Sequence, residues 1–198
     1  MYARYVEEYI LARKLDRRPG GVVLGGCSMG GALSIAVALR GRVKLRGLVL
    51  IGTFGTATHL PAWQRFCAPL AWVLPMGLAR RVAWQMVARS RLFGTVTPAE
   101  ADWLVSNKAR RNQRYFATAI KALTTMNQIE AAKNLAIPTV VVHGTKDIVL
   151  PHAAGAELAE TIPGARLVTI QDSGHALFFT DYEQVNAAIA AFLQELKK

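Results

Sequence analysis

The sequence predicts an α/β fold: a parallel sheet of about four strands with flanking helices, and a helical cap inserted between the second and third strands. Short runs rich in valine, leucine and isoleucine, which suit buried parallel strands, alternate with longer segments of helical periodicity. Glycine and proline separate these segments, for example at Pro163 and Gly164. Strands that alternate with helices form βαβ units, so we expect the sheet to be covered on both faces.

Each element has its own local signal. The chain opens with an amphipathic helix that ends at the sequence DRRPGG, because proline and glycine do not continue a helix. The last helix follows a capping box, in which Thr180 and Glu183 would satisfy free amide groups. We expect helices over residues 1–15, 32–39, 153–161 and 181–196, and strands over residues 22–25, 45–52, 137–144 and 165–171.

Residues 54–127 form the predicted cap, and residues 1–53 and 128–198 form the core that it covers. This cap segment has ten basic and two acidic residues, so it holds +8 of the net charge of +11. A solvated helical surface with an apolar underside explains this composition. A basic segment with four tryptophans could also attract nucleic acid, an anionic membrane or an acidic protein. No base-reading motif occurs, so we predict no nucleic-acid partner.

The composition is that of a globular protein, with 52% hydrophobic residues and a mean hydropathy of +0.22 over 198 residues. No run reaches the roughly 18 uninterrupted apolar residues of a membrane-spanning helix. The charged first residues do not resemble a signal peptide. Cys27 and Cys67 provide neither a disulfide framework nor a metal-ligand spacing. We therefore predict a cytoplasmic protein without a metal.

Three residues with catalytic chemistry follow the carboxyl ends of predicted strands, where ligands bind in open parallel sheets. Ser28 lies in the sequence GCSMG between a buried strand and an apolar helix, Asp147 follows the third strand, and His175 follows the fourth. Serine is a poor nucleophile unless a base takes its proton, which His175 would do while Asp147 orients the imidazole. The Met29 backbone N–H would donate to the oxyanion, and the glycines Gly26 and Gly30 would give the turn room.

The chain resembles the α/β-hydrolase superfamily along its whole length. The segments GGCSMGG, VVVHGTKDIVLP and IPGARLVTIQDSGHALFFTDYEQVNAAIAAFL are similar to the nucleophile, acid and histidine segments of that family, in the same order. The resemblance implies a triad of Ser28, His175 and Asp147, and no metal or organic cofactor. It implies a serine hydrolase that cleaves a carboxylic ester or thioester through an acyl-serine, with a carbon–carbon bond hydrolase and an acyltransferase as open alternatives.

Other polar residues near the predicted triad are less favoured as catalytic residues. His143 comes at a strand end, and we expect it to support the acid loop. Asp172 is an alternative acid, but Asp147 is preferred because the acid should follow the preceding strand. Cys27 is expected to be an inert thiol.

Large apolar residues near the strand ends are candidate substrate contacts, although such residues are more often core. We expect Phe54, Trp63 and Phe178 (or Phe179) to contact the apolar acyl or aryl group of a small ester. Arginines of the cap would bind a carboxylated substrate or an acidic carrier protein; they are Arg80, Arg81, Arg110 and Arg111.

The start of the chain departs from the family pattern. Family members have several strands before the nucleophile strand and a His-Gly loop that supplies a second oxyanion donor, and nothing before Val22 resembles either. We therefore expect the first strand to have an unpaired edge, which a second chain or another copy of this one would cover. A gene fragment, a misannotated start and a split enzyme all fit. A missing oxyanion donor costs ~10²–10³ in rate, so the alternative to an enzyme is a non-catalytic or partner-dependent binding subunit.

Overall fold

The computed structural model describes residues 2–60 and 124–197, and between them only Leu78, Arg81, Thr97, Ala99 and Ala122. Most of the predicted cap therefore lies outside the described residues. So do five residues named in the sequence analysis, which are Trp63, Cys67, Arg80, Arg110 and Arg111. The cap and its boundaries at residues 54 and 127 stay a prediction.

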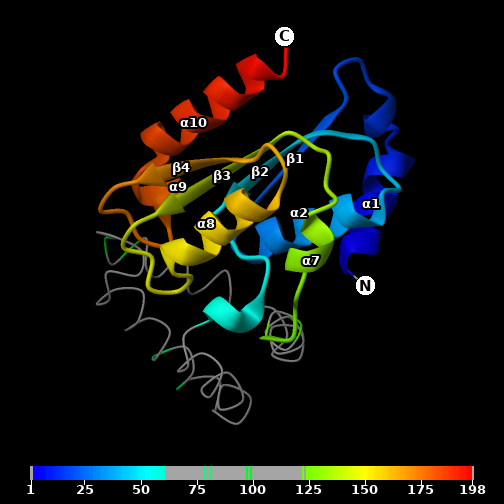
Figure 1. Ribbon diagram of the computed structural model, residues 1–198. Helices are drawn as coiled ribbons and strands as arrows, with labels where there is room; N and C mark the ends of the chain where they lie inside the picture. The colour runs from blue at the N-terminus through cyan, green and yellow to red at the C-terminus, as the bar shows by residue number, and fades with distance from the viewer. Residues whose placement is uncertain are drawn as a thin grey trace.

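Four parallel strands form one sheet in the order β1-β2-β3-β4 (Figure 1). Every strand end lies within two residues of its predicted place. The α/β class and the parallel sheet with flanking helices are confirmed. The strands are β1 (Val22–Cys27), β2 (Leu45–Ile51), β3 (Thr139–Gly144) and β4 (Arg166–Ile170).

Helices cover both faces of the sheet (Figure 1). On one face lie α2 (Met29–Arg40), α7 (Ile129–Ala132) and α8 (His152–Thr161), with α1 (Tyr2–Ala12) packed beside α2. On the other face lie α9 (Leu177–Thr180) and α10 (Tyr182–Glu195). Two short 3-10 helices, η1 (Leu15–Arg17) and η2 (Ala57–His59), follow α1 and β2.

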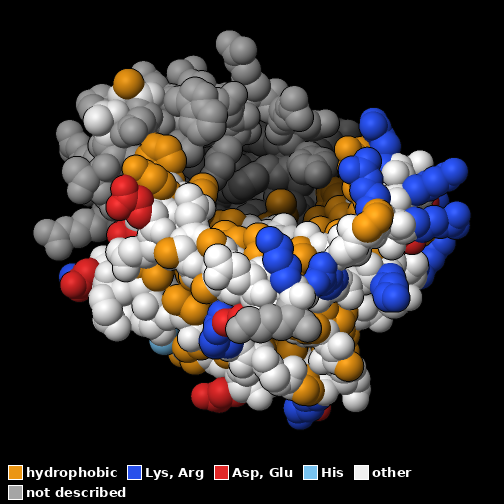
Figure 2. Space-filling view, turned by 90° about the horizontal axis from the view of Figure 1, so that it is seen from above, with side chains coloured by type: hydrophobic (Ala, Val, Ile, Leu, Met, Phe, Trp, Pro, Cys, Tyr) orange, Lys and Arg blue, Asp and Glu red, His pale blue; other side chains and the backbone are white. Residues whose placement is uncertain are grey.

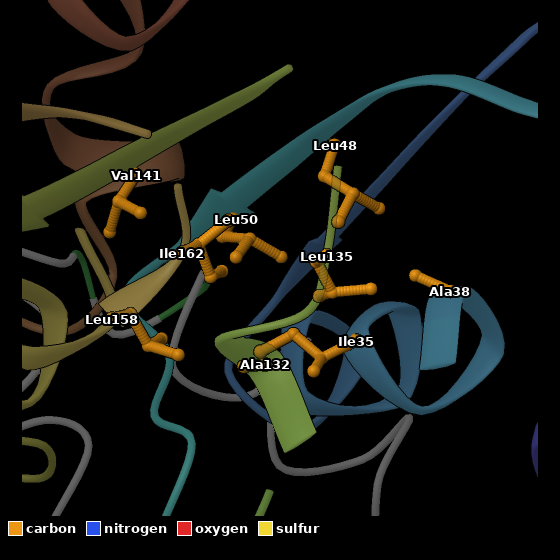
Figure 3. Packing of buried hydrophobic residues seen from close by; sticks show 9 residues of the cluster. All are labelled: Ile35, Ala38, Leu48, Leu50, Ala132, Leu135, Val141, Leu158 and Ile162. Carbon is orange, nitrogen blue, oxygen red and sulfur yellow. The ribbon is translucent and has the colours of Figure 1, made fainter. Parts of the chain in front are cut away.

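The two apolar layers follow from strand geometry, because successive side chains of a strand point to opposite faces. Leu48 and Leu50 of β2 and Val141 of β3 pack against α2, α7 and α8 (Figure 3). Their neighbours Val49 and Val140 point to the other side, into the cluster under α9 and α10. Both faces of β2 and β3 are thus buried, which is why these strands are almost continuously apolar.

The strand β1 is an edge of the sheet within the described part of the chain. It pairs with β2, and no second strand among the described residues pairs with its other side. The helices of the described part include none that is long and apolar enough to cross a membrane.

Positive charge is also present on the core. Residues 1–53 include nine basic and three acidic residues. Lys and Arg side chains gather on the right of Figure 2, the side on which α1 lies in Figure 1. The basic character is therefore not confined to the predicted cap.

The capping box expected at the last helix is wrong. Thr180 belongs to α9, and α10 follows Asp181 without a side-chain cap. The Thr180 hydroxyl instead donates to Asp181 Oδ2 at 2.6 Å, and the Ser173 hydroxyl donates to the same oxygen. Asp181 therefore ties the loop after β4 to the start of α10.

Candidate active site

Ser28 occupies a strained turn between β1 and α2. Its φ of 53° and ψ of −121° lie in a region that non-glycine residues rarely adopt. The turn is tight because the backbones of β1 and α2 nearly touch, and a Cβ added at Gly26 would overlap the Gly30 carbonyl carbon. A Cβ at Gly31 would lie 2.6 Å from the Thr53 side chain, whereas one at Gly30 would meet no atom of the described residues within 4 Å outside its own helix. The packing role expected for Gly30 therefore belongs to Gly31.

Thr53 fixes this turn to the end of β2, a role that sequence reasoning missed. Its buried hydroxyl donates to the Ser28 carbonyl oxygen at 2.6 Å. The Ser28 backbone N–H donates to the Ile51 carbonyl oxygen at 2.9 Å. The backbone N–H and C=O of Ser28 are thus held by the last residue of β2 and by Thr53, two residues beyond it. The sequence signal that could have identified Thr53 is a threonine two residues after the strand that follows the serine.

His175, in the loop after β4, lies between Ser28 and Asp147. Its Nε2 is 3.1 Å from Ser28 Oγ, and its Nδ1 is 2.8 Å from Asp147 Oδ2. A carboxylate can only accept, so the proton shared with Asp147 is on Nδ1, and Nε2 of the neutral ring is left to accept from the Ser28 hydroxyl. The ring is 8% exposed, which limits competition from water.

Asp147 is buried and has a donor for each oxygen. Its Oδ1 accepts from the N–H groups of Val149 at 2.9 Å and Leu150 at 2.8 Å, while Oδ2 faces His175. Burial alone would raise the pKa of Asp147, but hydrogen bonds from His143, His175 and Leu150, with the charge of His175, lower it from 3.8 to about 2. The side chain is therefore a carboxylate at neutral pH.

Asp172, the alternative acid, lies elsewhere. Its carboxylate pairs with Lys146 Nζ at 2.8 Å and is 80% exposed. The structure thus brings Asp147, rather than Asp172, to His175.

Backbone contacts between the loops after β3 and β4 explain how Asp147 meets His175. A Cβ at Gly144 would overlap the Ser173 carbonyl, so the loops touch at this point. The Lys146 N–H donates to the Ser173 oxygen at 2.8 Å, and the Thr145 N–H donates to the Ile170 oxygen at 3.0 Å. These bonds set the separation of the two loops.

The other predicted site residues divide into exposed and buried ones. Met29 is the first residue of α2, so its N–H has no partner within the helix. Phe178, on α9, is 45% exposed and available to a ligand. Phe54 is 1% exposed and packs in an apolar cluster with Leu60 and Leu150, so a core role is favoured for it.

Within residues 2–60 and 124–197, no group of His, Cys, Asp and Glu side chains is arranged to hold a metal ion.

Comparison with known proteins identifies the family. Residues 3–182 match the family model described as serine aminopeptidase, S33. The chain belongs to this family of α/β hydrolases.

Two relatives align with most of the chain. The 2-hydroxymuconate semialdehyde hydrolase of Pseudomonas putida is 29% identical over 98% of this chain and 69% of its own length. A pimeloyl-(acyl-carrier protein) methyl ester esterase of Nitrosomonas europaea is 27% identical over 85% of this chain and 70% of its own length. The chain spans much less of other relatives: 27% of BpoC of Mycobacterium tuberculosis and 9% of the polyketide synthase ThaQ of Burkholderia thailandensis.

Solved structures share the fold at low identity. A hydrolase from Pseudomonas aeruginosa PA01 is 21% identical, with a TM-score of 0.81 over 96% of this chain and 70% of that chain. A thermophilic esterase from Thermogutta terrifontis is 23% identical, with a TM-score of 0.78 over 99% of this chain and 72% of that chain. These likenesses show the α/β-hydrolase fold.

Proposed function

We propose that this chain is a serine hydrolase that cleaves a carboxylic ester, or a thioester, through an acyl-Ser28 intermediate. The observation that carries the proposal is the continuous hydrogen-bonded path from Ser28 Oγ through His175 to Asp147. The path starts at a strained strand-to-helix turn and ends at a buried carboxylate, which are the features that an activated serine needs.

In the proposed reaction, His175 Nε2 takes the Ser28 proton as Oγ bonds to the substrate carbonyl carbon. The carbonyl oxygen becomes an oxyanion that accepts from the Met29 N–H at the start of α2. The proton then passes from His175 to the leaving oxygen or sulfur, and the bond from that atom to carbon breaks. Water, deprotonated by the same ring, attacks the acyl-serine and releases the acid and Ser28. Asp147 stays ionised throughout and orients the ring, in agreement with its low pKa.

An apolar acyl or aryl group is the proposed substrate feature. Each reacting residue has an exposed apolar side chain close to it in the sequence: Met29 beside Ser28, Ile148 beside Asp147, and Phe178 three residues after His175. Binding sites for small molecules are mostly apolar with a few polar groups placed for chemistry. Trp63 of the cap remains a predicted further contact, outside the described residues.

An acidic carrier protein is the proposed source of the acyl group. Two relatives, from Nitrosomonas europaea and Aromatoleum aromaticum, are named pimeloyl-(acyl-carrier protein) methyl ester esterases. The +8 charge of residues 54–127 would attract an acidic partner, with an effect that weakens as salt increases. The alternative is a binding subunit that needs a second chain beside β1 for activity.

Labelling with a fluorophosphonate tests the proposed nucleophile. We expect mass spectrometry to find the adduct on Ser28 in the purified 198-residue chain, and Ser28→Ala to abolish it. Ser34→Ala is the matched control, because Ser34 lies in α2, the helix that follows Ser28, and its hydroxyl already donates to the Gly30 carbonyl oxygen. A folded chain that does not label would overturn the proposal for the isolated chain and favour the partner-dependent subunit.

A further inference from the structure

His143 is a buried ionisable group that the proposed reaction does not use. It lies in β3, one residue before the strand ends, and its side chain is fully buried. Its Nε2 is 2.9 Å from the Leu150 carbonyl oxygen and 3.4 Å from Asp147 Oδ2. The oxygen that faces His175 therefore faces a second imidazole as well.

The surroundings of the ring determine where its proton lies. The Leu150 carbonyl oxygen can only accept, so Nε2 must carry the hydrogen of this bond, and Asp147 Oδ2 is a second, longer contact of the same nitrogen at 3.4 Å. The other nitrogen, Nδ1, is buried and has no hydrogen-bond partner among the described residues. It lies against Gly155 of α8, where a Cβ would overlap it. The packing thus favours the Nε2–H form of His143 in one orientation.

The ionisable neighbours of the two rings are few within the described part of the chain. His143 faces Asp147 from its own loop and His152 from α8, whose ring centroid is 5.8 Å away. His175 faces Asp147 and Ser28. Burial lowers the pKa of His152, and the neighbouring His143 ring lowers it further, so both favour the uncharged form of His152. Its Nε2 is occupied by the Thr169 hydroxyl at 2.9 Å.

An N–H group that faces a carboxylate oxygen offsets part of its negative charge, so Asp147 Oδ2 attracts the His175 ring less strongly while His143 Nε2–H also faces it. His143 and His175 both lower the pKa of Asp147 against the effect of burial, which agrees with their positions at 3.4 Å and 2.8 Å from Oδ2. Removing this donor would leave Asp147 Oδ2 to His175 alone, and the imidazolium form of His175 would then be stabilised more strongly.

We propose that His143 is a positioning residue: its Nε2–H shares Asp147 Oδ2 with His175 and so limits how strongly Asp147 holds the charged imidazole. The catalytic meaning of this role rests on the proposed function, in which His175 must be uncharged to accept the Ser28 proton. His143 thus favours the uncharged form of His175, the form that can accept the Ser28 proton, at lower pH. It does so without touching the substrate.

The test compares His143→Leu, which removes the donor at similar volume, with His143→Gln, whose amide N–H reaches the place of Nε2. We expect the midpoint of the His175 imidazole titration, followed by NMR, to rise in H143L by roughly half a unit to one unit. H143Q should titrate near the wild type. The acidic limb of the kcat/KM profile should move by the same amount in H143L and stay in place in H143Q.

A merely structural role would lower the yield or the unfolding free energy of H143L without moving the titration. Coincident wild-type and H143L titrations would therefore overturn the proposal, as would an H143Q midpoint shifted as far as that of H143L. The NMR titration needs a folded chain but no turnover. If Ser28 of the wild type is not labelled by the fluorophosphonate, the proposed function is refuted. The NMR titration of His175 in the wild type and in H143L would still measure the effect of His143 on His175.

A measurement on the wild type covers the case in which H143L does not fold. Nitrogen-detected NMR of the histidine rings, with H143Q used to assign the signal, reports which nitrogen of His143 carries the hydrogen. We expect the Nε2–H form. An Nδ1–H form would remove the donor to Asp147 and overturn the proposal.

Discussion

The two halves of the candidate site are held by different forces. Ser28 is held mainly by close packing, with two backbone hydrogen bonds in support: its strained turn exists because Gly26 and Gly31 let α2 approach β1 and Thr53. Asp147 and His175 are held by polar contacts: the Asp147 carboxylate accepts from two backbone N–H groups and from the His175 ring, and the His143 ring lies 3.4 Å from the same oxygen. Added atoms should therefore disrupt the serine turn, and removed charge or donors should disrupt the acid and histidine loops.

The largest effect should come from Asp147→Asn. The amide can donate to His175 Nδ1, which favours the wrong tautomer of the ring, and we expect kcat to fall by roughly 10⁴-fold. The fold should survive, because Asn retains an oxygen for the Val149 and Leu150 N–H groups. Ester hydrolysis and circular dichroism together check this expectation, and a loss of less than about tenfold would mean that another group orients His175.

Gly26→Ala should disrupt the Ser28 turn through steric overlap alone. The new methyl group would overlap the Gly30 carbonyl carbon, and we expect the free energy of unfolding to fall by about 3 kcal/mol, with loss of Ser28 labelling. Gly30→Ala is the matched control, because its Cβ has space and alanine favours a helix by up to about 1 kcal/mol. Urea unfolding of both variants checks this expectation. Equal destabilisation would mean that the Cβ position of Gly30 is as closely packed as that of Gly26.

Stability at low pH should separate the two aspartates. The folded-state pKa of Asp147 is depressed from 3.8 to about 2, so its contribution of about 2 kcal/mol is present above pH 4 and is lost as pH falls toward 2. Asp147→Asn should flatten this part of the stability curve, measured by urea unfolding between pH 5 and pH 2. Asp172→Asn, which removes only an exposed ion pair, should leave the curve unchanged.

The smallest effect is expected from Thr53→Val, which removes the donor to the Ser28 carbonyl oxygen. We expect a loss of about 1–2 kcal/mol in stability and about tenfold in kcat. Thr53→Ser keeps the hydroxyl and should recover most of both. If the valine variant labels and turns over like the wild type, the turn does not need this hydrogen bond.

The sequence predicted what depends on neighbours along the chain. The GCSMG turn, the four strands and the long helices depend on local apolar patterns and on glycine, so residues such as Ser28 and Gly26 could be identified directly. Thr53, Gly31 and the burial of Phe54 depend on contacts between β2, α2 and the loop before α8, which no local pattern contains. The Thr180 capping box failed for a local reason: Thr180 is the last residue of α9, and its hydroxyl donates to the neighbouring Asp181 carboxylate, which also accepts from Ser173.

The hydrogen bond between Ser28 and His175 joins residues that are 147 positions apart. A chain under synthesis therefore carries its serine long before it has the histidine that would activate it, and the bond can form only after β4 has joined the sheet. Reactivity of Ser28 should consequently appear late, after most of the secondary structure has formed. In a refolding experiment, the rate at which the chain becomes labelled would time the completion of the native topology, which signals from helix formation alone do not report.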